Sequence, residues 1–89
     1  MRPELPEWMT PVDRDILELL ENQGNRELVL TPRLIAENTD WKRATVREHV
    51  RTLHKRGFLE YYDESGSIYQ LSTEGRTFLA GEFDVTTQQ

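Results

Sequence analysis

The sequence predicts a small, mainly helical α+β domain that carries one β-hairpin. Two Thr-Pro pairs, at residues 10–11 and 31–32, are typical helix starts, and apolar residues at helical spacing follow them. Two strand-like runs, 58–62 and 68–72, flank a polar loop with a glycine near its tip, which is typical of a hairpin. A chain of 89 residues has room for one hydrophobic core and no second domain.

The first helix is expected to begin at Pro11, after Thr10 as its N-cap. Asp13 then occupies the third helical position, where its carboxylate complements the helix dipole. The pair Gly24-Asn25 is expected to end the helix. Its expected apolar side consists of Val12, Ile16, Leu17, Leu19 and Leu20.

A short apolar run, Leu28-Val29-Leu30, suits a single β-bridge because it is too brief for a helix. The second Thr-Pro pair opens a helix through about Asn38, with Leu34 and Ile35 facing the core.

Residues 39–41 are expected to form a tight corner before a third helix over residues 42–56, which Gly57 ends. Asp40 stands where such a corner often needs a left-handed backbone, which aspartate tolerates better than branched residues do. Trp41 supplies an apolar plug for the corner.

In the hairpin, Tyr61 and Tyr69 are expected to pack inward across the strands and Tyr62 to be exposed. Ser72 is expected to cap a last short helix. Its apolar side would hold Phe78, Leu79 and Phe83.

Residues 42–56 carry most of the positive charge of an acidic chain. The segment contains Lys42, Arg43, Arg47, Arg51, Lys55 and Arg56 against Glu48 alone, which gives a local charge of +5. The other residues carry five positive and fifteen negative charges, or −10, which recovers the total of −5. A cationic helix on an anionic body is the electrostatic footprint expected for a phosphate backbone.

Composition limits the other classes of function. No cysteine is present, so disulfides and thiolate metal sites are excluded. No apolar run reaches the roughly 20 residues of a membrane span, and no export signal is recognisable, so a cytoplasmic protein is expected. Nine arginines, two lysines and sixteen acids resemble the acidic surface of a halophilic protein, although acidic mesophilic proteins can look similar. The expected division is an arm (1–10), a domain (11–83) and a flexible tail (84–89).

Catalysis is not expected. His49 and His54 are five residues apart, which is poor spacing for a shared metal ion, and structural roles are favoured for both. No glycine-rich phosphate loop and no nucleophile elbow occur in the sequence. We therefore expect no enzyme activity, no cofactor, no metal ion and no small-molecule effector.

Several motifs follow one another in a known order. Residues 34–37 read apolar-apolar-Ala-Glu, a Thr-Val pair stands at residues 45–46, and Leu53 precedes Gly57-Phe58 by a fixed spacing. On these residues, and on the hairpin and helix that follow, the chain resembles the winged helix-turn-helix superfamily of DNA-binding regulators over residues 11–80. Its acidity and details most resemble small repressor-like regulators of haloarchaea and their viruses.

The resemblance implies a sequence-specific regulator of double-stranded DNA, a repressor rather than an activator, that reads the major groove with helix 42–56. On that helix Val46, Val50 and Leu53 form the core stripe, and Arg47, Arg51 and Lys55 lie opposite. Arginine can bond bidentately to guanine, which makes Arg43 and Arg47 the candidates for reading bases. The full set of candidate DNA contacts is Arg33, Lys42, Arg43, Ala44, Thr45, Arg47, Arg51 and Lys55, with Arg56 as a further phosphate contact.

Some alternatives stay open. The hairpin of residues 58–72, which would be the wing, contains Glu60, Asp63 and Glu64 but no lysine or arginine. It therefore either stays away from DNA or makes weak contacts through residues 65–67. The domain could also be a winged-helix module for protein–protein interaction, or a DNA-binding component of a plasmid-maintenance or toxin–antitoxin system.

A homodimer on a palindromic operator is expected, because doubling through a two-fold axis is the usual way to gain specificity. Its faces would be the last helix or the arm, unless these apolar residues close the core instead. The residues concerned are Leu5, Trp8, Met9, Phe78, Leu79 and Phe83.

Overall fold

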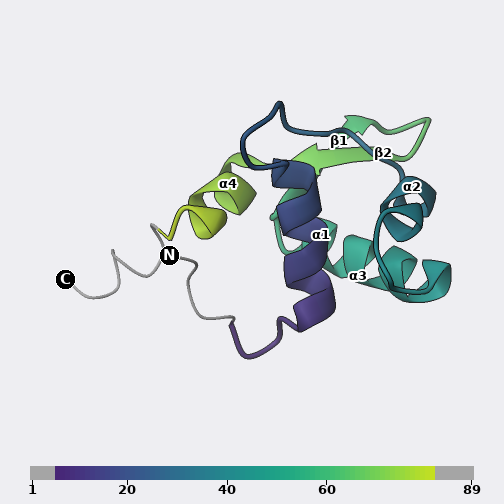
Figure 1. The fold of residues 1–89 in the computed structure, drawn as a ribbon, viewed down its shortest axis with the longest axis horizontal. Coiled ribbons are helices and arrows are strands. Elements are labelled where there is room, and N and C mark those ends of the chain that lie inside the picture. The colour runs from purple at the N-terminus through teal and green to yellow at the C-terminus, as the bar shows by residue number, and fades with distance from the viewer. Residues whose placement is uncertain (1–5, 82–89) are drawn as a thin grey trace.

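The computed structural model describes residues 6–81, which form four helices and a two-stranded antiparallel sheet, so the predicted α+β fold class is confirmed. In Figure 1, α2 and α3 lie together on one side of α1, α4 lies on its other side, and the hairpin crosses above α1. The elements are α1 (Pro11–Glu21), α2 (Pro32–Glu37), α3 (Arg43–Lys55), β1 (Leu59–Asp63), β2 (Ile68–Leu71) and α4 (Thr73–Leu79).

The cap of α1 is the predicted one. The backbone N–H and the hydroxyl of Thr10 both donate to Oδ2 of Asp13, at 2.8 and 2.9 Å. The helix ends at Glu21, slightly before the expected stop at Gly24, because Asn22 already takes the left-handed conformation with φ 51°.

The predicted bridge is present between Leu30 and Tyr69, whose backbones exchange two hydrogen bonds of 3.0 and 2.8 Å. Thr31 caps α2 by accepting a hydrogen bond from the Leu34 amide at 3.2 Å. The expectation that Leu34 faces the core is wrong, since this side chain is 44% exposed. A helix of six residues turns only one position fully inward, and Ile35 takes it.

The corner between α2 and α3 forms without a left-handed residue. Asp40 was expected to adopt that conformation, but in the described part of the chain the non-glycine residues with positive φ are Asn22 and Ser67. Thr39 closes the corner instead, because its N–H and hydroxyl donate to the carbonyl of Ala36 and its hydroxyl oxygen accepts from the Trp41 amide. Trp41 packs against the core, as predicted, and its Nε1–H donates to Asp15 at 2.8 Å.

The core lies between α1, α3, α4 and the hairpin. Burial of Val46, Val50 and Leu53 at 0–1% exposure confirms the core stripe of α3. Lys42 and Arg56 serve as the caps of this helix, and Gly57 follows with φ 88°. The other buried apolar residues are Met9, Val12, Ile16, Leu17, Leu20, Ile35, Phe58, Leu59, Tyr69, Leu71, Phe78 and Leu79.

The hairpin pairs Leu59 with Leu71 and shifts its register between Tyr61 and Asp63. Tyr69 is buried and Tyr62 is exposed, as predicted. Tyr61 packs across the hairpin on Tyr69, as predicted, with the ring centres 4.8 Å apart, but at the edge of the register shift it is still 38% exposed rather than buried.

The apolar residues considered for a dimer face close the core instead. Met9, Phe78 and Leu79 are only 2–5% exposed, and the Trp8 ring packs edge-on against Phe58 at 5.7 Å. Ser72 caps α4 as predicted, accepting from the Gly75 amide at 3.1 Å. The remaining candidates, Leu5 and Phe83, lie outside the described residues.

Candidate nucleic-acid interface

The outward face of α3 carries exposed cations. Because Val46, Val50 and Leu53 hold one side of the helix against the core, the residues between them project on the other side. Thr45 is half-buried at the edge of this face. The exposed candidates are Lys42, Arg43, Ala44, Arg47, Arg51 and Lys55 on or beside α3, and Arg33 on α2.

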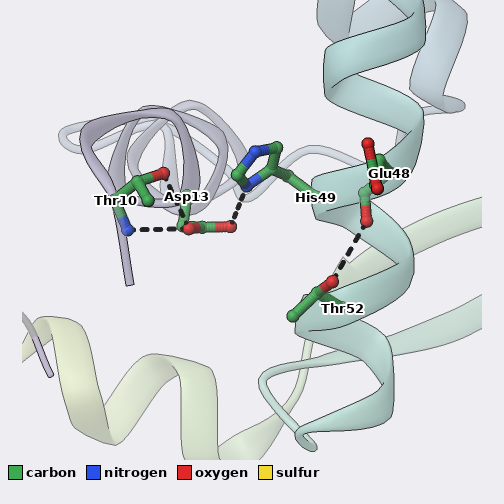
Figure 2. A network of polar contacts seen from close by, with 5 residues as sticks. All are labelled: Thr10, Asp13, Glu48, His49 and Thr52. Atoms are coloured by element: carbon green, nitrogen blue, oxygen red, sulfur yellow. Dashed lines mark hydrogen bonds and ion pairs between the residues drawn. The ribbon is translucent and has the colours of Figure 1, made fainter. Parts of the chain in front are cut away.

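None of these cations is neutralised within the described structure. The ion pairs there join Arg76 to Glu27 and His49 to Asp13, and no carboxylate of residues 6–81 lies within 4 Å of a basic group on the α3 face. The one acid on α3, Glu48, is exposed, and its backbone carbonyl accepts from the Thr52 hydroxyl (Figure 2). The positive charge of this face is therefore available to a ligand.

A cleft of ≈ 550 Å³ separates α3 from the wing and from the start of α2. It brings together Arg33, Arg47 and Arg51, whereas the other five candidates lie outside its lining. No carboxylate contributes to this lining, so its field is strongly positive. The lining residues are Thr31, Pro32, Arg33, Arg47, Arg51, His54, Tyr61, Ser67 and Tyr69.

A second hollow, of ≈ 580 Å³, has the opposite charge. It lies between α1 and the corner that precedes α3, and its lining includes Asp15, Glu18 and Asp40 but no basic residue. The two hollows make the domain electrostatically polar, so an anionic ligand is attracted to the cleft and repelled from the hollow.

Two tyrosines in the cleft were not predicted as site residues. The hydroxyl of Tyr69 donates to that of Tyr61 at 3.3 Å, and their rings lie 4.8 Å apart. His54 packs on both rings, at 4.6 and 5.7 Å. The strand pattern indicated only their mutual packing, because the cleft depends on where α2 and α3 lie in space.

A partly buried contact positions α3 relative to α1. The Nδ1 atom of His49 lies 2.8 Å from Oδ1 of Asp13. The other carboxylate oxygen of Asp13 accepts the hydrogen bonds from Thr10, and Figure 2 shows this network. The helix dipole alone was expected to account for Asp13, but the structure also makes its carboxylate the link between the two helices. Nothing in the local sequence around either residue indicates a contact across 36 positions.

Arg56, the further candidate for a phosphate contact, is exposed and lies over an aromatic ring of the arm. Its guanidinium carbon lies 4.6 Å from the centre of the Trp8 ring, which is a cation–π contact. The contact ties the arm to the end of α3.

Two other kinds of site are absent from the part of the chain that the structure describes. Between Pro6 and Gly81 no three His, Cys, Asp or Glu side chains are grouped so that they could hold a metal ion. None of the four helices has the length and apolar character of a membrane span.

Comparison with known proteins agrees with this architecture. The family described as winged helix-turn-helix phage repressor matches residues 1–88. A repressor protein of Halobacterium phage phiH is 39% identical over 80 residues, which cover 89% of this chain and 88% of the phage protein. No solved structure matches the chain. The four helices, the hairpin wing and these matches together show that the chain belongs to the winged helix-turn-helix phage repressor family.

Proposed function

We propose that this chain is a repressor that binds a specific double-stranded DNA site by laying α3 in the major groove. Membership of the phage repressor family supports a DNA-binding repressor. The observation that carries the finer statement is the exposed cationic face of α3, which meets no carboxylate among residues 6–81. A major groove admits an α-helix, and occupancy of an operator is sufficient for repression.

The candidate residues divide into two roles. Arg43 stands in the first turn of α3, where helices of this kind approach base edges, and its fork matches the O6 and N7 acceptors of guanine. Ala44 and Thr45 follow it directly, and Arg47, one turn later, is the second candidate for reading bases. Phosphate contacts fall to the remaining cations, which are Arg33, Lys42, Arg51 and Lys55.

The repressor is further proposed to bind as a homodimer at a palindromic operator. One α3 helix of 13 residues can read only a few base pairs, and two copies related by a two-fold axis double that number. Since Phe78, Leu79 and Met9 are used in the core, the dimer contact has to come from other residues.

Selection of bound duplexes from a random DNA pool tests the proposal. The expected result is one enriched site with two-fold symmetry, whose affinity falls steeply as the salt concentration rises. Arg43→Ala is expected to weaken and relax the recognition of that site. A matched control is Arg26→Ala, because Arg26 is an exposed arginine outside the α3 face.

Two results would contradict the proposal. No enrichment, combined with duplex binding that is insensitive to salt, would favour a module for protein–protein interaction. Equal affinity and equal sequence preference of the Arg43→Ala protein would remove α3 from its role as the reader of bases.

A further inference from the structure

We propose that the cleft between α3, the start of α2 and the wing holds a backbone phosphate of the bound duplex, to which the Tyr61 hydroxyl donates a hydrogen bond. The inference rests on the proposed function and adds a specific contact from the wing. It also assigns the wing's contribution to the body of the hairpin, away from the acidic tip.

The charges around the cleft suit an anion. Arg33, Arg47 and Arg51 reach it from two helices, and Thr31 and Ser67 add hydroxyl groups. With no acid in the lining, an entering phosphate meets the guanidinium groups of Arg33 and Arg51, gains attraction from the charge of the base-reading Arg47 beside them, and meets no repelling charge. The volume of ≈ 550 Å³ exceeds that of one phosphate group, so there is room for the sugars on either side of it.

The tyrosine pair supplies a directed donor. The Tyr69 hydroxyl donates a hydrogen bond to the oxygen of Tyr61, and the O–H of Tyr61 is then available to donate to another acceptor. Among the described residues that hydroxyl donates to no protein acceptor, and Tyr61 is 38% exposed. A hydroxyl that accepts one hydrogen bond becomes a stronger donor for the next, because the two bonds polarise each other.

The pair is held ready in this arrangement. The Tyr69 backbone is bonded to Leu30, and His54 of α3 packs on both rings. Burial, followed by the hydrogen bond and charge of Tyr61, raises the pKa of Tyr69 to about 12, against a lowering effect of Arg51. Tyr69 therefore keeps its proton at neutral pH and continues to donate to Tyr61.

The acidic tip stands apart from this contact. Asp63 accepts a hydrogen bond from Ser65 within the tip, at 2.9 Å, and neither Asp63 nor Glu64 lines the cleft. The wing can thus meet DNA through Tyr61 and Ser67 while its carboxylates stay outside the cleft. A wing without lysine or arginine thus contributes to DNA binding through neutral hydroxyl groups.

The decisive variant is Tyr61→Phe, which removes one hydroxyl and keeps the ring. Its matched control is Tyr62→Phe, on the same strand but 61% exposed and outside the cleft. The full chain is titrated with its selected operator, and thermal unfolding verifies that each variant is folded. Tyr61→Phe is expected to bind about tenfold more weakly, the usual effect of losing a hydrogen bond to a charged group, and Tyr62→Phe to bind as the unaltered protein does.

Operators with one neutral methylphosphonate at a time then locate the contact. At one backbone position in each half-site the substitution should weaken binding of the unaltered protein but cause little further loss with Tyr61→Phe, because the hydrogen bond is already absent. The proposal is overturned if Tyr61→Phe binds like the unaltered protein, or if its losses add fully to those of every methylphosphonate.

The test separates this inference from the proposed function. If the unaltered protein binds its operator and Arg43→Ala weakens that binding while Tyr61→Phe does not, only the phosphate contact is refuted. If the unaltered protein binds no duplex, both proposals fail.

Discussion

His49 of α3 and Asp13 of α1 form a partly buried contact of 2.8 Å between Nδ1 and Oδ1, although 36 positions separate them in the chain. The Asp13 side chain is only 2% exposed and also receives both donors of Thr10. One carboxylate therefore caps α1 and, together with the buried Val46, Val50 and Leu53, fixes the rotation of α3 about its own axis. That rotation decides whether Arg43 and Arg47 point outward.

Replacement of Asp13 should be among the most damaging single changes on α1. Asp13→Ala removes the acceptor of three hydrogen bonds and leaves the His49 donor without a partner in a partly buried position. The expected loss is about 2–3 kcal/mol in the free energy of unfolding, measured by urea titration. Glu37→Ala, at an exposed position, is the control and should change stability by less than about 0.5 kcal/mol. An Asp13→Ala protein as stable as this control would refute the role given to the carboxylate.

Gly75 should resist substitution although it lies inside a helix. A Cβ atom there would collide with the backbone carbonyl oxygen of Phe58 and would lie 3.2 Å from Cδ2 of Leu71. Alanine has the higher helix propensity, by about 1 kcal/mol, but the overpacking is expected to outweigh it and to destabilise the protein by about 2 kcal/mol net. Thr73→Ala, at an exposed position of α4, is the comparison in the same urea titration. A more stable Gly75→Ala protein would show that α4 can move away from Phe58.

The two ends of α3 should differ in what they contribute to binding. Lys55→Ala, at the C-terminal end, is expected to weaken binding equally for all duplexes and to lower the slope of log affinity against log salt by about 1. Arg43→Ala, at the N-terminal end, should instead reduce discrimination at one base pair, by about 1–3 kcal/mol. Competition titrations with operator and scrambled duplexes at several salt concentrations separate these effects. The same loss of discrimination in both variants would contradict the division of roles.

The stability of the domain should fall in alkaline solution partly through Tyr69. Its pKa is raised from 10.0 to about 12, mainly by burial, so between these values the folded state holds a proton that the unfolded state loses. The stability is fully present below pH 10 and decreases by up to ~1.4 kcal/mol per pH unit as the pH rises toward 12. Tyr69→Phe should remove this part of the decline, as measured by urea titration at pH 8, 10 and 11. Tyr62→Phe should keep it, and an unchanged decline in Tyr69→Phe would exclude Tyr69 as its source.

Features set by neighbouring residues could be predicted from the sequence. Thr10, Thr31 and Ser72 cap their helices as expected, and the core stripe of α3 follows from the spacing of its apolar residues. The bridge at Leu30 was also foreseen, because a run of three apolar residues has few other structural uses. In these cases the physical cause lies within a few positions of the effect.

Features set by the packing of distant elements could not be predicted in this way. The exposure of Leu34 depends on how the short α2 lies against α3, and Thr39 made a left-handed Asp40 unnecessary. In the candidate site, periodicity was sufficient to select the exposed cations of α3. It could not show that Tyr61 and Tyr69 would share a cleft with Arg51, because three separate elements meet there.

Two backbone hydrogen bonds between Leu30 and Tyr69 join the segment before α2 to strand β2. The wall of the cleft at the start of α2 and the wall formed by the hairpin are therefore held rigidly together. The cleft is therefore preorganised in the folded protein, and the protein loses little conformational entropy when a ligand binds there. On binding, the DNA then has to change its shape more than the protein does. Among operators with the same contacted bases, those whose intervening steps bend or twist most easily should be preferred.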